Sequence, residues 1–193
     1  MRIRYTTGLA VAAGLLAMAV GGATIHAAVT QPSTDVPKTI PDGPAPGVTA
    51  SINSTLNFTT AGTITDADMT FTITHTFDAD IELRLTRPGG TPVLIIGDCG
   101  GGNDNFTNTR ISDEGTPINC TAGAPYTGTF TGAPTGTSNP TVMTAFDTFA
   151  SNGVWNLNAA DDSPADTGTL VSWSLTLDGA PPLPVELQKL EVK

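Results

Sequence analysis

The amino-acid sequence predicts an all-β protein that folds as an antiparallel β-sandwich. Short segments rich in threonine, valine, isoleucine and phenylalanine alternate between apolar and polar residues, as strands with one buried face do. Clusters of glycine, asparagine, aspartate and proline separate these segments and are typical of turns. No window places apolar residues at i, i+3 and i+4 over a useful length, so helices are not expected to carry the fold.

The first 28 residues have the pattern of a signal peptide. Arg2 and Arg4 form a short positive region, residues 8–23 are apolar and rich in small residues, and small residues surround a cleavage point near Ala28. An uncleaved transmembrane anchor is the alternative, but the apolar run is short for a span and its leucines are diluted by glycine and alanine. We therefore expect a secreted, extracellular or cell-envelope protein with no membrane span after signal cleavage.

The charge of the mature chain excludes several classes of partner. Removal of the signal leaves 18 acidic and 6 basic residues, a net charge of −12. Such a surface repels nucleic acid, because nucleic-acid binding depends on lysine and arginine neutralising phosphates. Anionic membranes are disfavoured for the same reason, whereas calcium or a cationic partner is favoured.

Two proline-rich segments flank the predicted domain. Residues 29–47 contain five prolines, lack periodicity and predict an extended lead-in. Residues 180–193 form a second, proline-started tail. Residues 48–179 remain as the folded β-sandwich.

Within residues 48–179, the alternation predicts five strands in order. In each strand, residues i, i+2 and i+4 point to the same face, and the apolar set is expected to face the core. The predicted strands and inward residues are 70–77 (Phe71, Ile73, His75 and Phe77), 80–86 (Ile81, Leu83 and Leu85), the apolar run 92–97, residues 154–159, and 170–177 (Val171, Trp173, Leu175 and Leu177).

The chain has two cysteines, Cys99 and Cys120. In an exported chain such a pair is expected to form a disulfide, and two free thiols are the less favoured alternative. The bridge would close a loop of about twenty residues and stabilise the fold by roughly 3 kcal/mol in the chain-entropy model.

No catalytic arrangement can be drawn from the sequence. The mature chain has a single histidine, His75, on an inward strand face, and no Gly-x-Ser-x-Gly motif. A serine hydrolase needs a nucleophile paired with an oriented base, so we expect His75 to be structural, with its ring nitrogens bonded to the backbone. Zinc motifs are absent, and the aspartates lie in turns rather than as the buried acid of a glycosidase. We expect no catalysis by this chain alone.

The stretch CGGGNDNFTNTRISDE, from Cys99 to Glu114, is rich in glycine, carboxylates and amides. It lacks the lysine of a phosphate-binding loop and no helical pattern follows it, so a phosphate site is excluded. Calcium prefers several carboxylate, amide and backbone oxygens held by an irregular turn. We therefore predict that this stretch is a calcium loop, with solvated turn aspartates as the alternative.

Further acidic motifs favour calcium. The D-A-D motifs at residues 66–68 and 78–80 are spaced so that an extended strand would present both carboxylates on one face. The second motif is expected to join the loop from the preceding strand end, and Asp161 or Asp166 to complete this site or a second one. The predicted ligands of Ca²⁺ are Asp78, Asp80, Asp98, Asp104, Asn105, Asp113, Glu114, Asp161 and Asp166.

Residues 73–96, ITHTFDADIELRLTRPGGTPVLII, resemble the opening of the P domain (P/Homo B) that follows the catalytic domain of proprotein convertases and many bacterial subtilisin-like proteases. Residues 100–114, 124–132 and 145–177 resemble the later blocks of that family in the same order. Departures are mild, since Ile81 replaces the usual leucine, Arg87 stands where serine is common and Thr148 where glycine is frequent. The matching residues include His75-Thr76, Asp80, Leu83, Leu85, the turn at 88–91, Asp104, Trp155, Asp166, Gly168 and Trp173.

The resemblance implies a jelly-roll β-sandwich of the galactose-binding-like kind, often with calcium stabilising its loops. The catalytic triad of the family lies in a separate domain. The resemblance therefore implies a non-catalytic accessory or stabilising module associated with serine-type endopeptidases and proteolysis, with a subtilisin-like protease or a cell-surface component as partner. The alternative is a cell-surface adhesion or carbohydrate-binding module unrelated to proteolysis.

Overall fold

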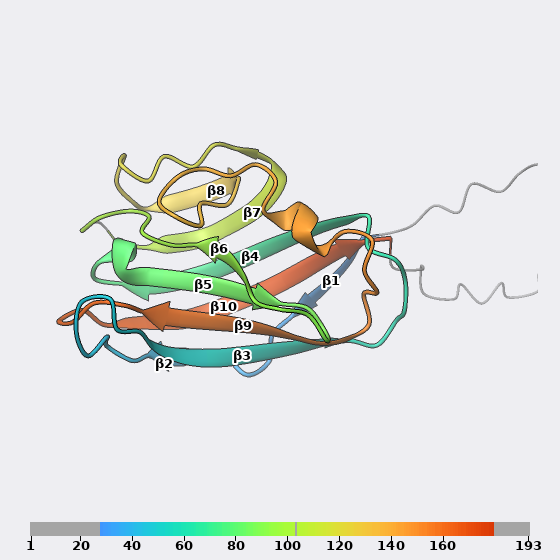
Figure 1. The fold of residues 1–193 in the computed structure, drawn as a ribbon, viewed down its shortest axis with the longest axis horizontal. Coiled ribbons are helices and arrows are strands. Elements are labelled where there is room, and N and C mark those ends of the chain that lie inside the picture. The colour runs from blue at the N-terminus through green and yellow to red at the C-terminus, as the bar shows by residue number, and fades with distance from the viewer. Residues whose placement is uncertain (1–27, 103, 180–193) are drawn as a thin grey trace, which may run out of the picture.

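A computed structural model describes residues 28–102 and 104–179 and arranges them as two β-sheets around one apolar core (Figure 1). The larger sheet has six strands in the order β1–β10–β4–β7–β8, with β2 also paired to β10, and the smaller has four in the order β3–β9–β5–β6. The predicted all-β sandwich is therefore confirmed. Residues 1–27 and 180–193, which carry the predicted signal peptide and tail, lie outside the described residues.

The strands are β1 (Val29–Pro32), β2 (Lys38–Ile40), β3 (Ala50–Phe58), β4 (Asp66–His75), β5 (Ile81–Thr86), β6 (Val93–Ile96), β7 (Phe106–Thr116), β8 (Tyr126–Phe130), β9 (Gly153–Asp161) and β10 (Gly168–Asp178). Two short 3-10 helices are η1 (Asp78–Asp80) and η2 (Met143–Phe146). Within the described ranges, no helix has the length and apolar character needed to cross a membrane.

The core is built from the inward residues of the alternating strands. Ile81, Leu83 and Leu85 of β5 are fully buried, as the alternation of that strand predicts. Trp155 of β9 packs against Phe146 of η2 with ring centroids 5.4 Å apart. Full burial of such a side chain contributes about 1.5–3 kcal/mol, so apolar burial is the main force that holds the two sheets together.

Two residues that were predicted to face inward are exposed. Val171 is 39% exposed and Leu170 is buried, because the pairing of β10 with β4 shifts register between Leu170 and Ser172. Such a bulge adds one residue and changes which side chains face the core. Phe77 is 38% exposed because β4 ends at His75 and the chain then turns into η1.

One strand pair is parallel, although the sequence predicts an antiparallel sandwich. β8 pairs with β7 in the same direction, with Tyr126 opposite Phe106. The reason is that residues 117–125 carry the chain back along β7 before β8 begins (Figure 1).

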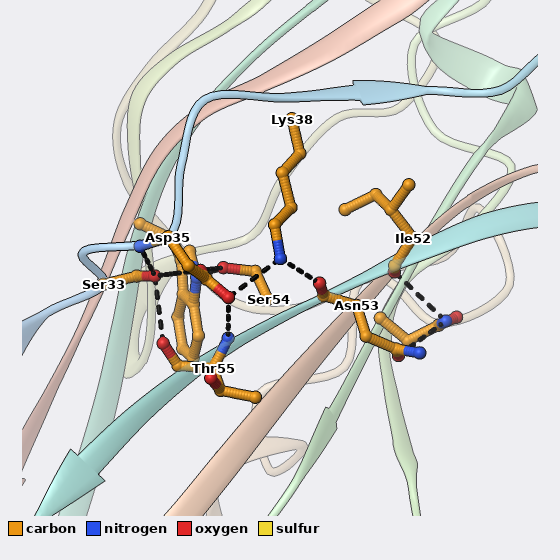
Figure 2. A network of polar contacts seen from close by, with 9 residues as sticks. Ser33, Asp35, Lys38, Ile52, Asn53, Ser54 and Thr55 are labelled. Carbon is orange, nitrogen blue, oxygen red and sulfur yellow. Dashed lines mark hydrogen bonds and ion pairs between the residues drawn. The ribbon is translucent and has the colours of Figure 1, made fainter.

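The lead-in, expected only to be extended, adds two short strands to the larger sheet. β1 and β2 both pair with β10, and Asp35 lies in the segment between them. Its carboxylate accepts hydrogen bonds from Ser33 Oγ (2.7 Å), Lys38 Nζ (2.8 Å), the Thr55 N–H (3.1 Å) and Ser54 Oγ (Figure 2). Because Ser54 and Thr55 belong to β3 of the other sheet, this carboxylate ties the lead-in to both sheets.

The hydrogen bonds around Asp35 also set its charge state. Partial burial acts to raise the pKa of Asp35, but the bonds from Lys38 and Ser54 together with those from Ser33 and Thr55 outweigh it and hold the pKa well below its usual range. Buried Ser54 in turn accepts the Trp173 Nε1–H at 2.7 Å, so the network reaches into the core.

Candidate metal centre

Cys99 and Cys120 form a disulfide, as predicted, with Cα atoms 4.5 Å apart. The bridge joins the turn after β6 to the connection at residues 117–125. Beside it, the Gly100 N–H donates to the Cys120 carbonyl at 3.2 Å. Together these contacts hold the glycine turn that follows Cys99 against the connection.

The stretch from Cys99 to Glu114 is not one loop. Its first half is a turn, whereas β7 begins at Phe106 and includes Asp113 and Glu114. The strand from Phe106 to Asp113 spans roughly 20 Å, so Asp104 cannot share an ion with Asp113 or Glu114. The prediction of a single calcium loop is wrong in this respect, because ladder hydrogen bonds to β4 and β8 extend the second half as a strand.

Asp78 is a carboxylate that the fold leaves without a hydrogen-bond donor. It begins η1, it is fully buried, and neither of its carboxylate oxygens has a partner. Burial, and then the charge of Asp104, raises the pKa of Asp78 to about 8. A buried carboxylate without donors is costly, because it gives up hydration and gains no hydrogen bond. A cation beside Asp78 would remove that cost.

The wall beside Asp78 is formed by the glycine turn and β8. A Cβ atom on Gly100 would lie 2.7 Å from Asp78 Cβ and 3.1 Å from Tyr126 Cε2, so only glycine fits at this position. The Gly101 carbonyl accepts the Ala79 N–H of η1 at 3.4 Å. Backbone carbonyls and a second aspartate next to a buried aspartate are the type of oxygen donors that calcium takes.

Asp80 belongs to a second acidic group at the same end of the molecule. Burial, followed by the charges of Asp161, Asp166 and Asp162, raises the pKa of Asp80 to about 6. The Asp80 carbonyl accepts the Asp162 N–H at 3.0 Å, and Thr76 Oγ1 donates to Asp166 at 2.7 Å. The structure thus brings the predicted ligands Asp80, Asp161 and Asp166 together from η1 and the β9–β10 turn.

Asp161 is already engaged by His75. His75 Nε2 lies 3.1 Å from Asp161 Oδ2, both side chains are fully buried, and the Ser163 N–H donates to Asp161 Oδ1 at 3.0 Å. The other ring nitrogen, Nδ1, lies 2.8 Å from the Phe77 carbonyl. His75 has structural contacts as expected, but one of its partners is a carboxylate rather than backbone, because β9 ends in the core beside it.

Asn105 and Asp98 have other contacts, although the charge of Asp98 is among the causes, after burial and Glu82, that raise the pKa of Asp162. Asn105 Oδ1 accepts the His75 N–H at 2.9 Å and its carbonyl accepts the Tyr126 N–H at 3.1 Å, so this residue links β4 to β8. Asp98 is exposed and adopts a positive φ of 53° on the turn before Cys99.

Asp113 and Glu114 lie elsewhere on the larger sheet. Asp113 Oδ1 accepts the Met143 N–H at 3.1 Å, at the start of η2. Carboxylate oxygens of Glu114, Asp66 and Asp68 all lie within 4.8 Å of one another. The D-A-D motif at residues 66–68 is visible in the sequence, but its contact with Glu114 is not, because it joins strands that are far apart along the chain.

An open pocket of about 320 Å³ lies between β2, β4 and β10, beside Asp104 and Asn105. Five of its nine lining residues are threonines, and the others are His75, Asp104, Asn105 and Gly168. The threonines are Thr39, Thr74, Thr76, Thr167 and Thr169.

Comparison with known proteins gives a family match and a curated relative. The model of the family described as proprotein convertase P-domain matches residues 64–177, which include β4 to β9 and all of β10 except its last residue. A curated relative, Leupeptin-inactivating enzyme 1 of Streptomyces exfoliatus, is 24% identical over 137 residues, which are 71% of this chain and 24% of the relative.

Two solved structures are also similar to this chain. The complex of the Aeromonas sobria serine protease with the chaperone ORF2 gives a TM-score of 0.45 at 15% identity, covering 80% of this chain and 27% of that chain. The serine protease of Aeromonas sobria gives 0.40 at 14% identity, covering 79% and 27%. This chain thus spans about a quarter of the length of the proteins that it matches.

Proposed function

The chain belongs to the proprotein convertase P-domain family, and on this basis we propose that it is a non-catalytic accessory module that stabilises a subtilisin-like serine endopeptidase. The observation that carries the proposal is the family match over residues 64–177, which takes in strands of both sheets. The partner protease is expected to be a separate chain or a neighbouring domain.

The environment of His75 supports a role without chemistry. Its side chain is fully buried, and its ring nitrogens contact Asp161 and the Phe77 backbone. A general base must reach the proton that it removes from a nucleophile, and His75 has no such access. The module would therefore affect proteolysis by contact with a protease domain.

We place the module outside the cytoplasm. The Cys99–Cys120 disulfide supports this location, because disulfides persist mainly in oxidising compartments. A cleaved signal peptide at residues 1–28 would provide the route, and N-terminal sequencing of the mature protein tests it.

Calcium stabilisation is the third part of the proposal. The unpartnered oxygens of Asp78 fit a cation, Asp104 adds a second carboxylate, and Asp80 and Asp166 lie at the same end. Asp161 is less available because His75 engages it. When bound, the ion would supply the positive charge that this end lacks and would hold the glycine turn against η1.

The accessory role is tested by combining the pure module with a subtilisin-like protease secreted by the same cells. We expect the two to co-purify and the half-life of protease activity at elevated temperature to lengthen several-fold. The module alone should hydrolyse no peptide substrate. Failure to co-purify, together with an unchanged half-life, would contradict the accessory role.

The calcium part is tested by the melting temperature in chelator and in millimolar calcium. Calcium at about 100 times its Kd adds about 2.7 kcal/mol, which is a rise of about 5–10 °C for a domain of this size, and magnesium should do less. Asp78→Asn should make the rise clearly smaller. Asp42→Asn is the matched control, because the oxygen of the new amide can still accept the Ala165 N–H that Asp42 Oδ1 accepts at 2.9 Å.

The pocket between β2, β4 and β10 favours a second candidate function, carbohydrate binding. Its threonine hydroxyls with Asp104 and Asn105 are groups that pair with sugar hydroxyls. Binding of a cell-surface polysaccharide that is lost in Thr74→Val, without any protease association, would favour this candidate.

A further inference from the structure

A separate acidic group lies at the far end of β4 from η1. It consists of Asp66 and Asp68 of β4 and Glu114 of β7, whose carboxylate oxygens all lie within 4.8 Å of one another. β4 has ten residues and ends just before η1, so about 30 Å of strand separates the two ends. No single ion can serve both places.

The pairing of the strands concentrates negative charge here. Asp66 lies directly opposite Asp178 of β10, and like charges at facing positions of a sheet repel. Burial and the charges of Asp68, Glu114 and Asp178 raise the pKa of Asp66 to about 6, which reflects the same repulsion. The larger sheet therefore carries four carboxylates on three adjacent strands at this end.

Arg110 neutralises this group only in part. It contacts Asp68 Oδ2, and its own side chain is 46% exposed. The other basic residues of the described ranges have partners elsewhere: Lys38 with Asp35, Arg84 with Glu82, and Arg87 over the ring of Phe149. One guanidinium thus interacts with the three carboxylates of Asp68, Asp66 and Glu114.

Asp68 gives an independent sign that a ligand belongs here. The residue is 3% exposed, and its Oδ1 is buried without a hydrogen-bond partner. Buried carboxylate oxygens in native proteins normally have a donor or a cation. Asp68 stands on the same side of β4 as Asp66, so the unpartnered oxygen lies on the side chain that adjoins Asp66 and Glu114.

We propose that Asp66, Asp68 and Glu114 bind a calcium ion on the solvent side of the larger sheet, with Asp178 as a nearby fourth carboxylate. Carboxylates are the hard oxygen donors that calcium prefers, and the exposure of Glu114 leaves room for water to complete the coordination. The ion ties the first residues of β4 to the last residues of β7. Binding at this site requires neither an ion beside Asp78 of η1 nor a protease partner.

The test titrates calcium chloride into chelator-stripped mature protein carrying Asp78→Asn. This substitution removes the proposed ion beside Asp78, so any remaining binding can be assigned to Asp66, Asp68 and Glu114. Isothermal titration calorimetry should show that one calcium still binds per chain. Adding Glu114→Gln should weaken this binding at least tenfold, and the fold should persist because position 114 is exposed and the new amide oxygen can still accept the Ser112 Oγ–H. Asp147→Asn, a nearby carboxylate outside the group, should change the affinity less than twofold.

A second measurement locates the ion. In nuclear magnetic resonance spectra, the amide signals of residues 66–70 and 110–115 should shift on addition of calcium, and Glu114→Gln should abolish the shifts. Unchanged signals in several millimolar calcium would show that Arg110 alone satisfies the group and would overturn the proposal. Calcium binding that Glu114→Gln leaves unaltered would also overturn it.

Discussion

Asp35 and Asp78 are aspartates of the same acidic domain, but they differ in their hydrogen-bond donors and in the direction of their pKa shifts. Asp35 accepts hydrogen bonds from a lysine, two serines and a backbone N–H, and its pKa lies well below the usual range. Asp78 is fully buried without any donor, and its pKa is raised to about 8. The difference teaches that acidic composition does not by itself indicate where a cation would be stabilising, whereas a buried carboxyl group without hydrogen-bond donors does.

The largest expected effect comes from filling the space beside Asp78. In Gly100→Ala the new Cβ would lie 2.7 Å from Asp78 Cβ at a φ of +123°, so the free energy of unfolding should fall by about 3 kcal/mol. Gly101→Ala is the matched control, because its φ is also positive but nothing lies within 4 Å of its new Cβ, and it should cost about 1 kcal/mol. Urea denaturation compares the two variants. Equal losses would show that close packing against Asp78 is not what requires Gly100.

Removing the disulfide should affect the turn beside Asp78 more than the network around Asp35. Replacing Cys99 and Cys120 with serine should lower the free energy of unfolding by about 3 kcal/mol. The Gly100 N–H should then exchange with solvent much faster, because the turn that it anchors loses its tether. The exchange rate of the Thr55 N–H, which donates to Asp35, should rise only as much as the loss of global stability requires. Hydrogen exchange measures both amides, and equal acceleration would contradict a local effect.

Neutralising the two aspartates should shift stability in opposite directions. In chelator at neutral pH, Asp78→Asn should stabilise the protein by about 1–2 kcal/mol, because folding must otherwise protonate Asp78 or bury its charge, whereas a neutral amide requires neither. Asp35→Asn should destabilise it by about 1 kcal/mol, because charge-assisted hydrogen bonds are lost. Melting curves in chelator decide the signs. A loss of stability in both variants would mean that Asp78 has donors in solution.

The smallest expected effect is a pH dependence at Asp35. Folding lowers the pKa of Asp35, so its contribution is fully present above the unfolded value of about 3.9 and is lost as the pH falls toward the folded value. The stability difference between the natural protein and Asp35→Asn should therefore shrink below about pH 4. The side chain is 35% exposed, so the difference should stay near or below about 1 kcal/mol. Paired urea titrations at several pH values measure it, and a difference that grows on acidification would be inconsistent with the network.

Five of the ten strands in the described residues, β4, β5, β6, β9 and β10, were predictable because alternation shows which face of a strand is buried, and β5 follows that rule at every position. The bulge at Leu170 and the parallel pairing of β8 were not, since both depend on how distant segments align. At the candidate site, the D-A-D motif predicted Asp78 and Asp80 as ligands, but the expectation that residues 78–80 form an extended strand with both carboxylates on one face was wrong. Residues 78–80 form a 3-10 helix, which gives the two carboxylates different charged neighbours.

The pairing of β1 with β10 has a consequence for how this domain can be joined to others. Val29 lies opposite Leu177, so the chain enters and leaves the domain on neighbouring strands, about 5 Å apart. A host protein can carry such a domain as an insertion within a surface loop, because both junctions meet the host at one point. The same adjacency suits circular permutation: a short link between residues 28 and 179, with new ends opened in an exposed turn, keeps every strand pairing.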